Sequence, residues 1–416
     1  MTSFLNKLLL IYFLFVFNVN NSFGQDIIYA KQVISTLCSN NFHGRGYTNN
    51  GVKKASKFIF SELKKNNSNS SKYEFQKFRM PVSVITDLGN LKIDTTILKS
   101  GKEYIIHPNS KSCDGKYSIV KTDKTNFKEI LTQNLNNSFI AIDTSLTNDK
   151  TLKAIVENII HENTLHAKGV INLVNRNTMQ TQDNKPISWV SMEIPIYSFP
   201  ANAAFIEINF ASKQIDKYKT GNVFAIIPGS SDSIIAFTAH YDHIGELGDA
   251  VFCGANDNAS GVAMILDLYK TFCKEKPKYT IAFIFFTGEE IGLVGSQYFV
   301  SHPLIPLSRI KFLLNMDILG SGEDGITIVN STVFNNEYEL LKTINEEKKY
   351  LPKIKTRGAS NNSDHAPFYN AGVKSFFIYS QGKTGPYHNP ADTPENLSLG
   401  KYTEIVNLLI DFVNKL

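Results

Sequence analysis

The second half of this 416-residue chain predicts an α/β fold, with a mostly parallel central sheet flanked by helices. From Asn222 onward, apolar strand-like runs alternate with helical segments, the order that is typical of parallel sheets. Several of these runs are apolar without a break, as strands covered on both faces are. Between about Lys92 and Ala211, short β-like runs surround one expected helix instead, which indicates an inserted, smaller, β-rich domain.

The segments before the insert predict two helices and a strand. Residues 31–41 and 50–66 are the expected helices, and the second has apolar residues at helical spacing. A loop rich in Ser and Asn follows at residues 66–71, and residues 73–82 alternate like a strand. Within the insert, the expected helix covers residues 151–167.

The α/β part predicts five strands and four helices. The strands are residues 223–227, 234–240, 280–286, 312–316 and 375–379. The helices are residues 260–273, 295–300, 337–348 and 403–413. We therefore expect a main domain formed by residues 25–91 and 212–416, with the inserted domain at residues 92–211.

The N-terminus resembles a secretory signal peptide at residues 1–24. Lys7 precedes a wholly apolar or aromatic run at residues 8–17, and Ser22-Phe23-Gly24 offers small residues at cleavage spacing. The run is shorter than the roughly 20 residues that cross a bilayer. We therefore expect a secreted or periplasmic protein that starts at Gln25 and has no stable membrane span after cleavage.

The overall composition narrows the function classes. The net charge of +5 is spread without a long basic block, so we expect no nucleic-acid partner. The four cysteines lack C-x-x-C spacing, which excludes a zinc ribbon. One or two disulfides can form after export, three complete pairings are open, and unpaired buried cysteines are an equal alternative. The oligomeric state is left open.

Polar residues collect where the expected strands end, which is where open α/β sheets bind their ligands. Five such places occur, at residues 239–243, 254–261, 288–290, 315–317 and 387–393. Taken singly, His240 is typical of a core histidine, Asp257 of a helix cap and Asp317 of a turn residue. Together they supply two imidazoles and three carboxylates, donors that suit zinc or a similar divalent ion.

This ordered set resembles the di-zinc exopeptidases of clan MH, whose relatives include secreted bacterial leucine aminopeptidases, glutamate carboxypeptidase, the transferrin receptor and glutaminyl cyclase. The resemblance also covers His43-Gly44-Arg45-Gly46 and residues 288–296 and 388–397. It is most specific across residues 239–393. It is weaker over the insert, where residues 140–174 look like a protease-associated domain.

The resemblance implies two zinc ions per chain. His240 and Asp317 would hold one ion, Glu290 and His388 would hold the other, and Asp257 would bridge them. Each ion then has three protein ligands, and a shared water or hydroxide completes the shell.

The resemblance also implies roles for neighbouring residues. Asp242 would fix the tautomer of His240 through its second ring nitrogen. Glu289 would act as general base, because adjacent side chains diverge and only Glu290 should reach a metal. Tyr387 would donate to the tetrahedral oxyanion, with plain aromatic packing as the alternative. His243 has no family role and is expected to be structural, and residues 363–365 are expected to support the site or line its pocket.

The implied activity is that of an aminopeptidase, which removes N-terminal residues from peptides with a free N-terminus by metal-activated water. A carboxypeptidase or dipeptidase is an alternative. A glutaminyl cyclase-like transferase would use one zinc ion, and a non-catalytic binding ectodomain should lack ligands. The complete set of five ligands favours the hydrolase.

Overall fold

The computed structural model describes residues 26–67 and 71–416, so the expected signal peptide and Gln25 lie outside the described residues. None of the helices within these ranges combines the length and the apolar character that a bilayer crossing requires. Cys38, Cys113 and Cys253 are present as thiols.

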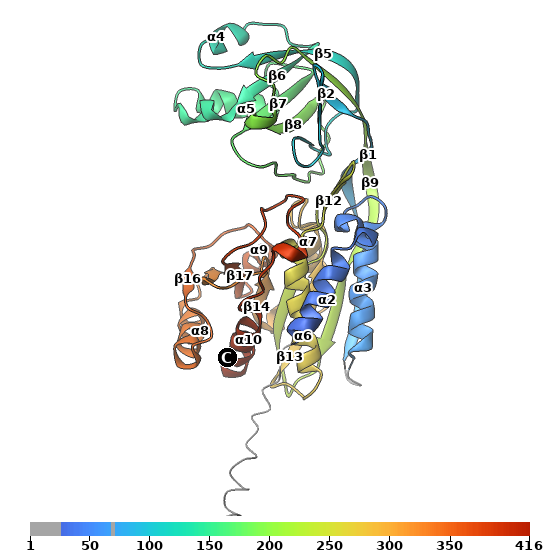
Figure 1. The fold of residues 1–416 in the computed structure, drawn as a ribbon. Coiled ribbons are helices and arrows are strands. Elements are labelled where there is room, and N and C mark those ends of the chain that lie inside the picture. Colours follow the sequence, from blue (N-terminus) through green and yellow to red (C-terminus); the bar gives the residue numbers. More distant parts are fainter. Residues whose placement is uncertain (1–25, 68–70) are drawn as a thin grey trace, which may run out of the picture.

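A long two-stranded ribbon joins a main unit to the insert (Figure 1). It pairs β1 (Lys72–Leu88) antiparallel with β9 (Phe205–Ile227) along almost their whole length. The ladder is irregular between Met80 and Val82 and again between Ile85 and Asp87. The expected strand at residues 223–227 is therefore only the end of β9, which runs through the expected domain boundary at residue 212.

The sheet of the main unit is mixed but mostly parallel. Its order is β16 (Ile354–Thr356), β15 (Gly325–Val329), β17 (Ser375–Gln381), β14 (Ile310–Met316), β10 (Ser231–His240), β13 (Tyr279–Phe286) and then β9. The pairs β15·β16, β14·β17, β10·β14 and β10·β13 are parallel, and β15·β17 and β13·β9 are antiparallel. The expected fold class is confirmed.

Helices cover both faces of this sheet. Side chains alternate along each strand, so that Phe237 of β10 joins one buried cluster and Ala236 joins another. The larger cluster packs α2 (Ile27–Leu37), α3 (Gly51–Lys65), α6 (Ser260–Phe272), α8 (Asn335–Lys348) and α10 (Tyr402–Lys415). The smaller cluster packs α7 (Val294–Ser301) and α9 (His365–Asn370) on the opposite face.

The strands of the insert continue the main sheet through β9, which pairs with β5 (Cys113–Thr122), and the insert has its own buried clusters. Four parallel strands form its centre: β5, β6 (Ser138–Asp143), β7 (Gly169–Val174) and β8 (Val190–Pro195). At the edges lie β2 (Leu91–Ile93), β3 (Thr96–Leu98) and β4 (Ile105–Ile106), with helices α4 (Phe127–Ile130) and α5 (Lys153–Glu162). Its longer helix, α5, is shorter than the predicted residues 151–167.

Several boundaries differ from expectation. The first helix begins and ends four residues earlier than predicted, because the Asp26 side chain accepts from the Tyr29 amide and starts it at Ile27. A 3₁₀ turn, Asn40–Arg45, takes the place of its predicted end. The short elements β15, β16 and α9 were not predicted, since three to six residues carry little periodicity.

Candidate metal centre

The candidate ligands lie at one edge of the main sheet. His240 ends β10, Asp317 directly follows β14, and Glu290 follows β13 after a short turn. These three strands are parallel neighbours, so their carboxyl ends meet. Asp257 lies in an irregular turn, Ala255–Ala259, before α6, and His388 lies in the loop after β17.

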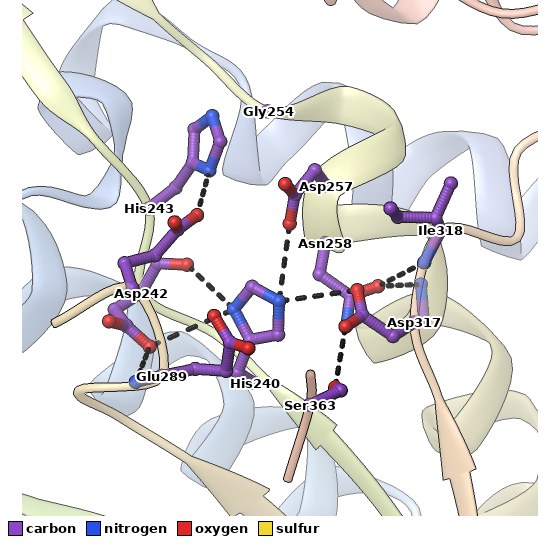
Figure 2. A network of polar contacts seen from close by, with 12 residues as sticks. His240, Asp242, His243, Gly254, Asp257, Asn258, Glu289, Asp317, Ile318 and Ser363 are labelled. Carbon is purple, nitrogen blue, oxygen red and sulfur yellow. Dashed lines mark hydrogen bonds and ion pairs between the residues drawn. The ribbon is translucent and has the colours of Figure 1, made fainter. Parts of the chain in front are cut away.

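The five candidate ligands form two groups that share Asp257. In one group, shown in Figure 2, Nε2 of His240 lies 3.2 Å from Oδ1 of Asp257 and 3.3 Å from Oδ1 of Asp317. In the other, Nε2 of His388 lies 3.1 Å from Oδ2 of Asp257 and 3.0 Å from Oε2 of Glu290. One carboxylate oxygen of Asp257 therefore faces each group.

These distances fit zinc. Ligand bonds of about 2.0–2.2 Å in a tetrahedron place neighbouring donor atoms about 3.3–3.6 Å apart, close to the distances observed. Nε2 of His388 is buried and makes no hydrogen bond of acceptable geometry, although two carboxylate oxygens lie close to it. The ligand atoms of Asp257, Glu290 and His388 all lie within 4.8 Å of one another, close enough to share one metal ion.

The ionisable groups show that the site requires positive charge. Burial by itself would lower the pKa of His388, but the carboxylates of Glu290 and Asp257 raise it to about 11. Burial raises the pKa of Glu290, but the charge of His388 outweighs this effect and lowers it to about 2. The carboxylates thus stay ionised in a buried place, where protons or metal cations must balance them.

Glu289 and Glu290 diverge, as expected for adjacent residues. The carboxylate of Glu290 lies in the His388 group, whereas an oxygen of Glu289 lies within 4.8 Å of ligand atoms of His240 and Asp317. Burial raises the pKa of Glu289 well above its ordinary range. Position and pKa both suit a carboxylate that exchanges protons beside the site.

Residues of the main unit hold the His240 group. Oγ of Ser363 donates to Oδ2 of Asp317 at 2.7 Å and accepts from the Asn315 side chain at 2.8 Å. The backbone carbonyl of Asp242 lies 3.2 Å from Nδ1 of His240, nearer than Oδ1 of the Asp242 carboxylate at 3.8 Å. That carboxylate accepts from the Tyr47 hydroxyl at 2.6 Å.

Residues outside the predicted set hold the Asp257 turn. The Asp392 carboxylate accepts from the amides of Asn256 and Asp257, at 2.9 and 3.1 Å. Arg45 is fully buried and donates to the carbonyls of Tyr241, Gly254 and Asp257. Gly44 permits this insertion, because a Cβ there would lie 2.3 Å from the carbonyl oxygen of Gly245.

His243 contacts a candidate ligand although no site role was assigned to it. Its Nδ1 lies 2.6 Å from Oε1 of Glu290. The sequence held a signal for this contact, since His243 stands in the same strand-end run as His240. Tyr47 carried no comparable signal, since it lies 195 residues away from Asp242, whereas Arg45 belongs to the run His43-Gly44-Arg45-Gly46 that the family resemblance covers.

Tyr387 lies at the mouth of the site. Its ring stacks on that of His388, with centroids 3.7 Å apart, and the residue is 51% exposed. Partial burial and the nearby carboxylates of Asp257 and Glu290 raise the pKa of Tyr387, so the phenol keeps its proton at neutral pH. The hydroxyl is therefore available as a donor.

The chain is similar to known proteins in sequence and in fold. Residues 222–413 match the family described as Peptidase family M28. The whole structure is similar to that of a zinc aminopeptidase from Bacillus subtilis, with a TM-score of 0.71, 21% identity and coverage of 93% of this chain and 94% of that chain. At this identity the likeness shows the fold, and it extends over the insert.

Two curated relatives match about half of the chain. A vacuolar membrane protease of Candida dubliniensis is 29% identical over 213 residues, which are 49% of this chain and 22% of the relative. A probable leucine aminopeptidase of Arthroderma otae is 32% identical over 225 residues, which are 50% of this chain and 60% of the relative. The match thus covers less than two thirds of the length of either relative.

Proposed function

We propose that this protein is a zinc-dependent exopeptidase that acts as an aminopeptidase, because residues 222–413 match the family described as Peptidase family M28. The observation that carries the proposal is the position of Asp257, whose two oxygens face two separate donor groups. A five-ligand set divided in this way suits two zinc ions rather than one.

The five candidate ligands would hold the ions as the sequence suggests: His240 and Asp317 on one, Glu290 and His388 on the other, and Asp257 on both. Zinc in such sites polarises the substrate carbonyl and lowers the pKa of a bound water to about 7. The side chains around the ions then determine where protons move and how the substrate lies.

Glu289 is the proposed general base. Its carboxylate lies beside the His240 group, where it takes a proton from the attacking water and passes it to the leaving amine. The Tyr387 hydroxyl donates to the oxyanion of the tetrahedral intermediate. Asp242 acts on His240 chiefly through its backbone carbonyl, while its carboxylate anchors Tyr47.

The proposed substrates are peptides with a free N-terminus. The aminopeptidase names of relatives support this choice, and the five ligands together with Glu289 argue against a non-catalytic binding ectodomain. Export to the periplasm or the medium is part of the proposal and rests on the apolar run at residues 8–17. Export is tested by recovering the protein from a culture of its own organism and sequencing its N-terminus. We expect the mature chain to begin at Gln25.

A substrate panel with metal analysis tests the activity. We expect turnover of amino-acid 4-nitroanilides, no turnover of their N-acetylated forms and close to two zinc ions per chain. Equal turnover of blocked and free substrates would assign a carboxypeptidase or an endopeptidase instead. Cyclisation of Gln-initiated peptides with a single bound zinc would assign the glutaminyl cyclase-like transferase.

A further inference from the structure

One loop of the insert reaches the candidate metal centre. Residues 178–184, here called the 178–184 segment, lie in the connection between β7 and β8, which descends toward the main unit (Figure 1). The Gln180 amide donates to the backbone carbonyl of His388 at 3.0 Å. The Gln180 carbonyl in turn lies 2.9 Å from Nδ1 of His388. The insert thus contacts both the backbone and the ring of a candidate ligand.

Neighbouring contacts fix this segment on the main unit. The Asn389 side chain donates to the Thr178 carbonyl at 2.8 Å, and both residues are buried. The Gln182 side chain donates to the carbonyl of Ile244, and that of Asn184 to the carbonyl of Ile291 at 3.4 Å. Even-numbered residues of the segment therefore contact the main unit.

The odd-numbered residues anchor the segment in the insert. The Met179 amide donates to Glu193 at 3.0 Å, and Glu193 also accepts two hydrogen bonds of 2.7 Å from Arg176. The Thr181 hydroxyl lies 2.9 Å from Nδ1 of His107. The segment is bonded to both the insert and the main unit, so a shift of the insert would move the groups that contact His388.

We propose that the 178–184 segment is a positioning element of the metal centre, and that zinc binding and docking of the insert stabilise each other. The inference rests on the proposed zinc site. A donor bond from Nδ1 to the Gln180 carbonyl fixes the tautomer of His388 and leaves the Nε2 lone pair for the metal.

The backbone of His388 needs this support. Its φ of +51° lies in the left-handed region, which costs a non-glycine residue free energy and persists only where the surroundings hold it. The bond from the Gln180 amide to the His388 carbonyl provides one such constraint, and the adjacent Asn389–Thr178 bond provides a second. Both constraints originate outside the main unit.

An apolar contact stabilises the docked position. Ile105 of the insert packs with Ile244, Leu247 and Phe252 of the main unit, and all four are at most 3% exposed. Here β11 (Gly245–Leu247) and β12 (Ala250–Phe252) form the hairpin on which the insert rests. Zinc binding and docking of the insert are two equilibria, and coupling between them is reciprocal. If zinc binds more tightly when the insert is docked, bound zinc must also favour docking.

Zinc titration of variants tests one direction of the linkage. Gln182→Ala removes a docking contact without touching a ligand, and Asn389→Ala removes the bond to Thr178. Partners of metal-bound histidines typically contribute 10- to 100-fold to metal affinity. We expect the dissociation constant of the more weakly bound zinc ion to rise about tenfold in each variant, as measured against a competing chelator. Tyr197→Phe is the control, because it removes only an exposed bond to the neighbouring Asn177.

Hydrogen exchange of the unaltered protein tests the other direction. Removal of zinc should accelerate exchange of the Gln180 amide, which is bonded to His388, and leave the Met179 amide, which is bonded to Glu193, unchanged. Wild-type zinc affinity in both variants, or equal Gln180 exchange with and without zinc, would overturn the proposal. Neither measurement needs a substrate, so a wrong peptide specificity would not affect the outcome.

Discussion

The two halves of the candidate metal centre are supported in different ways. His240 and Asp317, the strand half, stand at the ends of parallel strands, and Ser363 and Asn315 hold Asp317 from within the same unit. Glu290 and His388, the loop half, stand in turns, and His388 depends on a segment of the insert. The strand half is thus fixed by the sheet that creates it, whereas the loop half requires a second unit to be in place.

This difference separates two kinds of residue. Those that hold the strand half lie within residues 222–413, the region that matches the peptidase family. Those that hold the loop half and the shared Asp257 include Arg45 and Gln180, which lie outside it. A substitution outside residues 222–413 should therefore disturb Glu290 and His388, the loop half, before it disturbs the strand half.

Glu289→Gln should have the largest effect and separate chemistry from metal binding. The amide keeps the size of the side chain but accepts no proton at neutral pH, so kcat should fall by about 10²- to 10⁴-fold with zinc content unchanged. Glu290→Gln should lose zinc as well as activity, because it removes a charge from the loop half. Measuring kcat and bound zinc on the same preparations tests both expectations. Similar zinc loss in Glu289→Gln and Glu290→Gln would contradict the roles of general base and metal ligand.

Arg45→Met should weaken the turn that the two halves share. The change removes the buried donors to the carbonyls of Tyr241, Gly254 and Asp257 and leaves those acceptors unsatisfied. We expect the free energy of unfolding to fall by about 3 kcal/mol, measured by urea denaturation. Lys57→Met, at an exposed residue of α3, is the control. Equal stability of Arg45→Met and the control would show that Arg45 does not hold the turn.

His107→Gln should reveal a pH dependence that belongs to the insert. Burial lowers the pKa of His107 to about 4. The unfolded chain protonates this imidazole near pH 6.5, so its contribution to stability is complete above pH 6.5 and is lost as the pH falls toward 4. Between pH 7 and pH 5 the wild type should lose about 2 kcal/mol more than the variant. An equal loss of unfolding free energy between pH 7 and pH 5 in the wild type and in the variant would contradict this prediction.

Ser363→Ala should have the smallest effect. Asp317 loses the buried hydrogen bond from the Ser363 hydroxyl but keeps its place at the end of β14. We expect zinc affinity to fall by about tenfold, with hydrogen exchange of the Gln180 amide as slow as in the wild type. Fast exchange at Gln180 would show that the two halves are not independent.

Sequence patterns predicted the strands of the main sheet well. They predicted poorly which residues hold the candidate ligands in place. Apolar runs located β10, β13 and β14 within three residues, because fully buried strands leave a continuous pattern. The five candidate ligands come together because parallel strands end at one edge. The roles of Arg45, Gln180 and Asp392 could not be read in the same way. Arg45 and Asp392 bond to backbone groups, which every residue carries, and Gln180 acts through its own backbone.

The extent of β9 shows a second limit of pattern reading. Exposed and buried residues alternate regularly over residues 205–210, residues 211–219 are all exposed or half-buried, and only the last residues form an apolar run. The prediction therefore kept residues 223–227 and missed the continuous strand. Cross-strand pairing with β1, which determines that continuity, involves residues more than 100 positions apart.

The ribbon of β1 and β9 leaves the insert with a limited freedom of movement. A single two-stranded attachment restrains translation but permits twisting and bending, and the two irregularities between Met80 and Asp87 are where such a strand pair bends most readily. The 178–184 segment supplies a second, separate point of attachment that opposes rotation about the ribbon. Met80 also packs close to Gly288, the residue before Glu289, so a bend at the first irregularity reaches the turn that carries the proposed base.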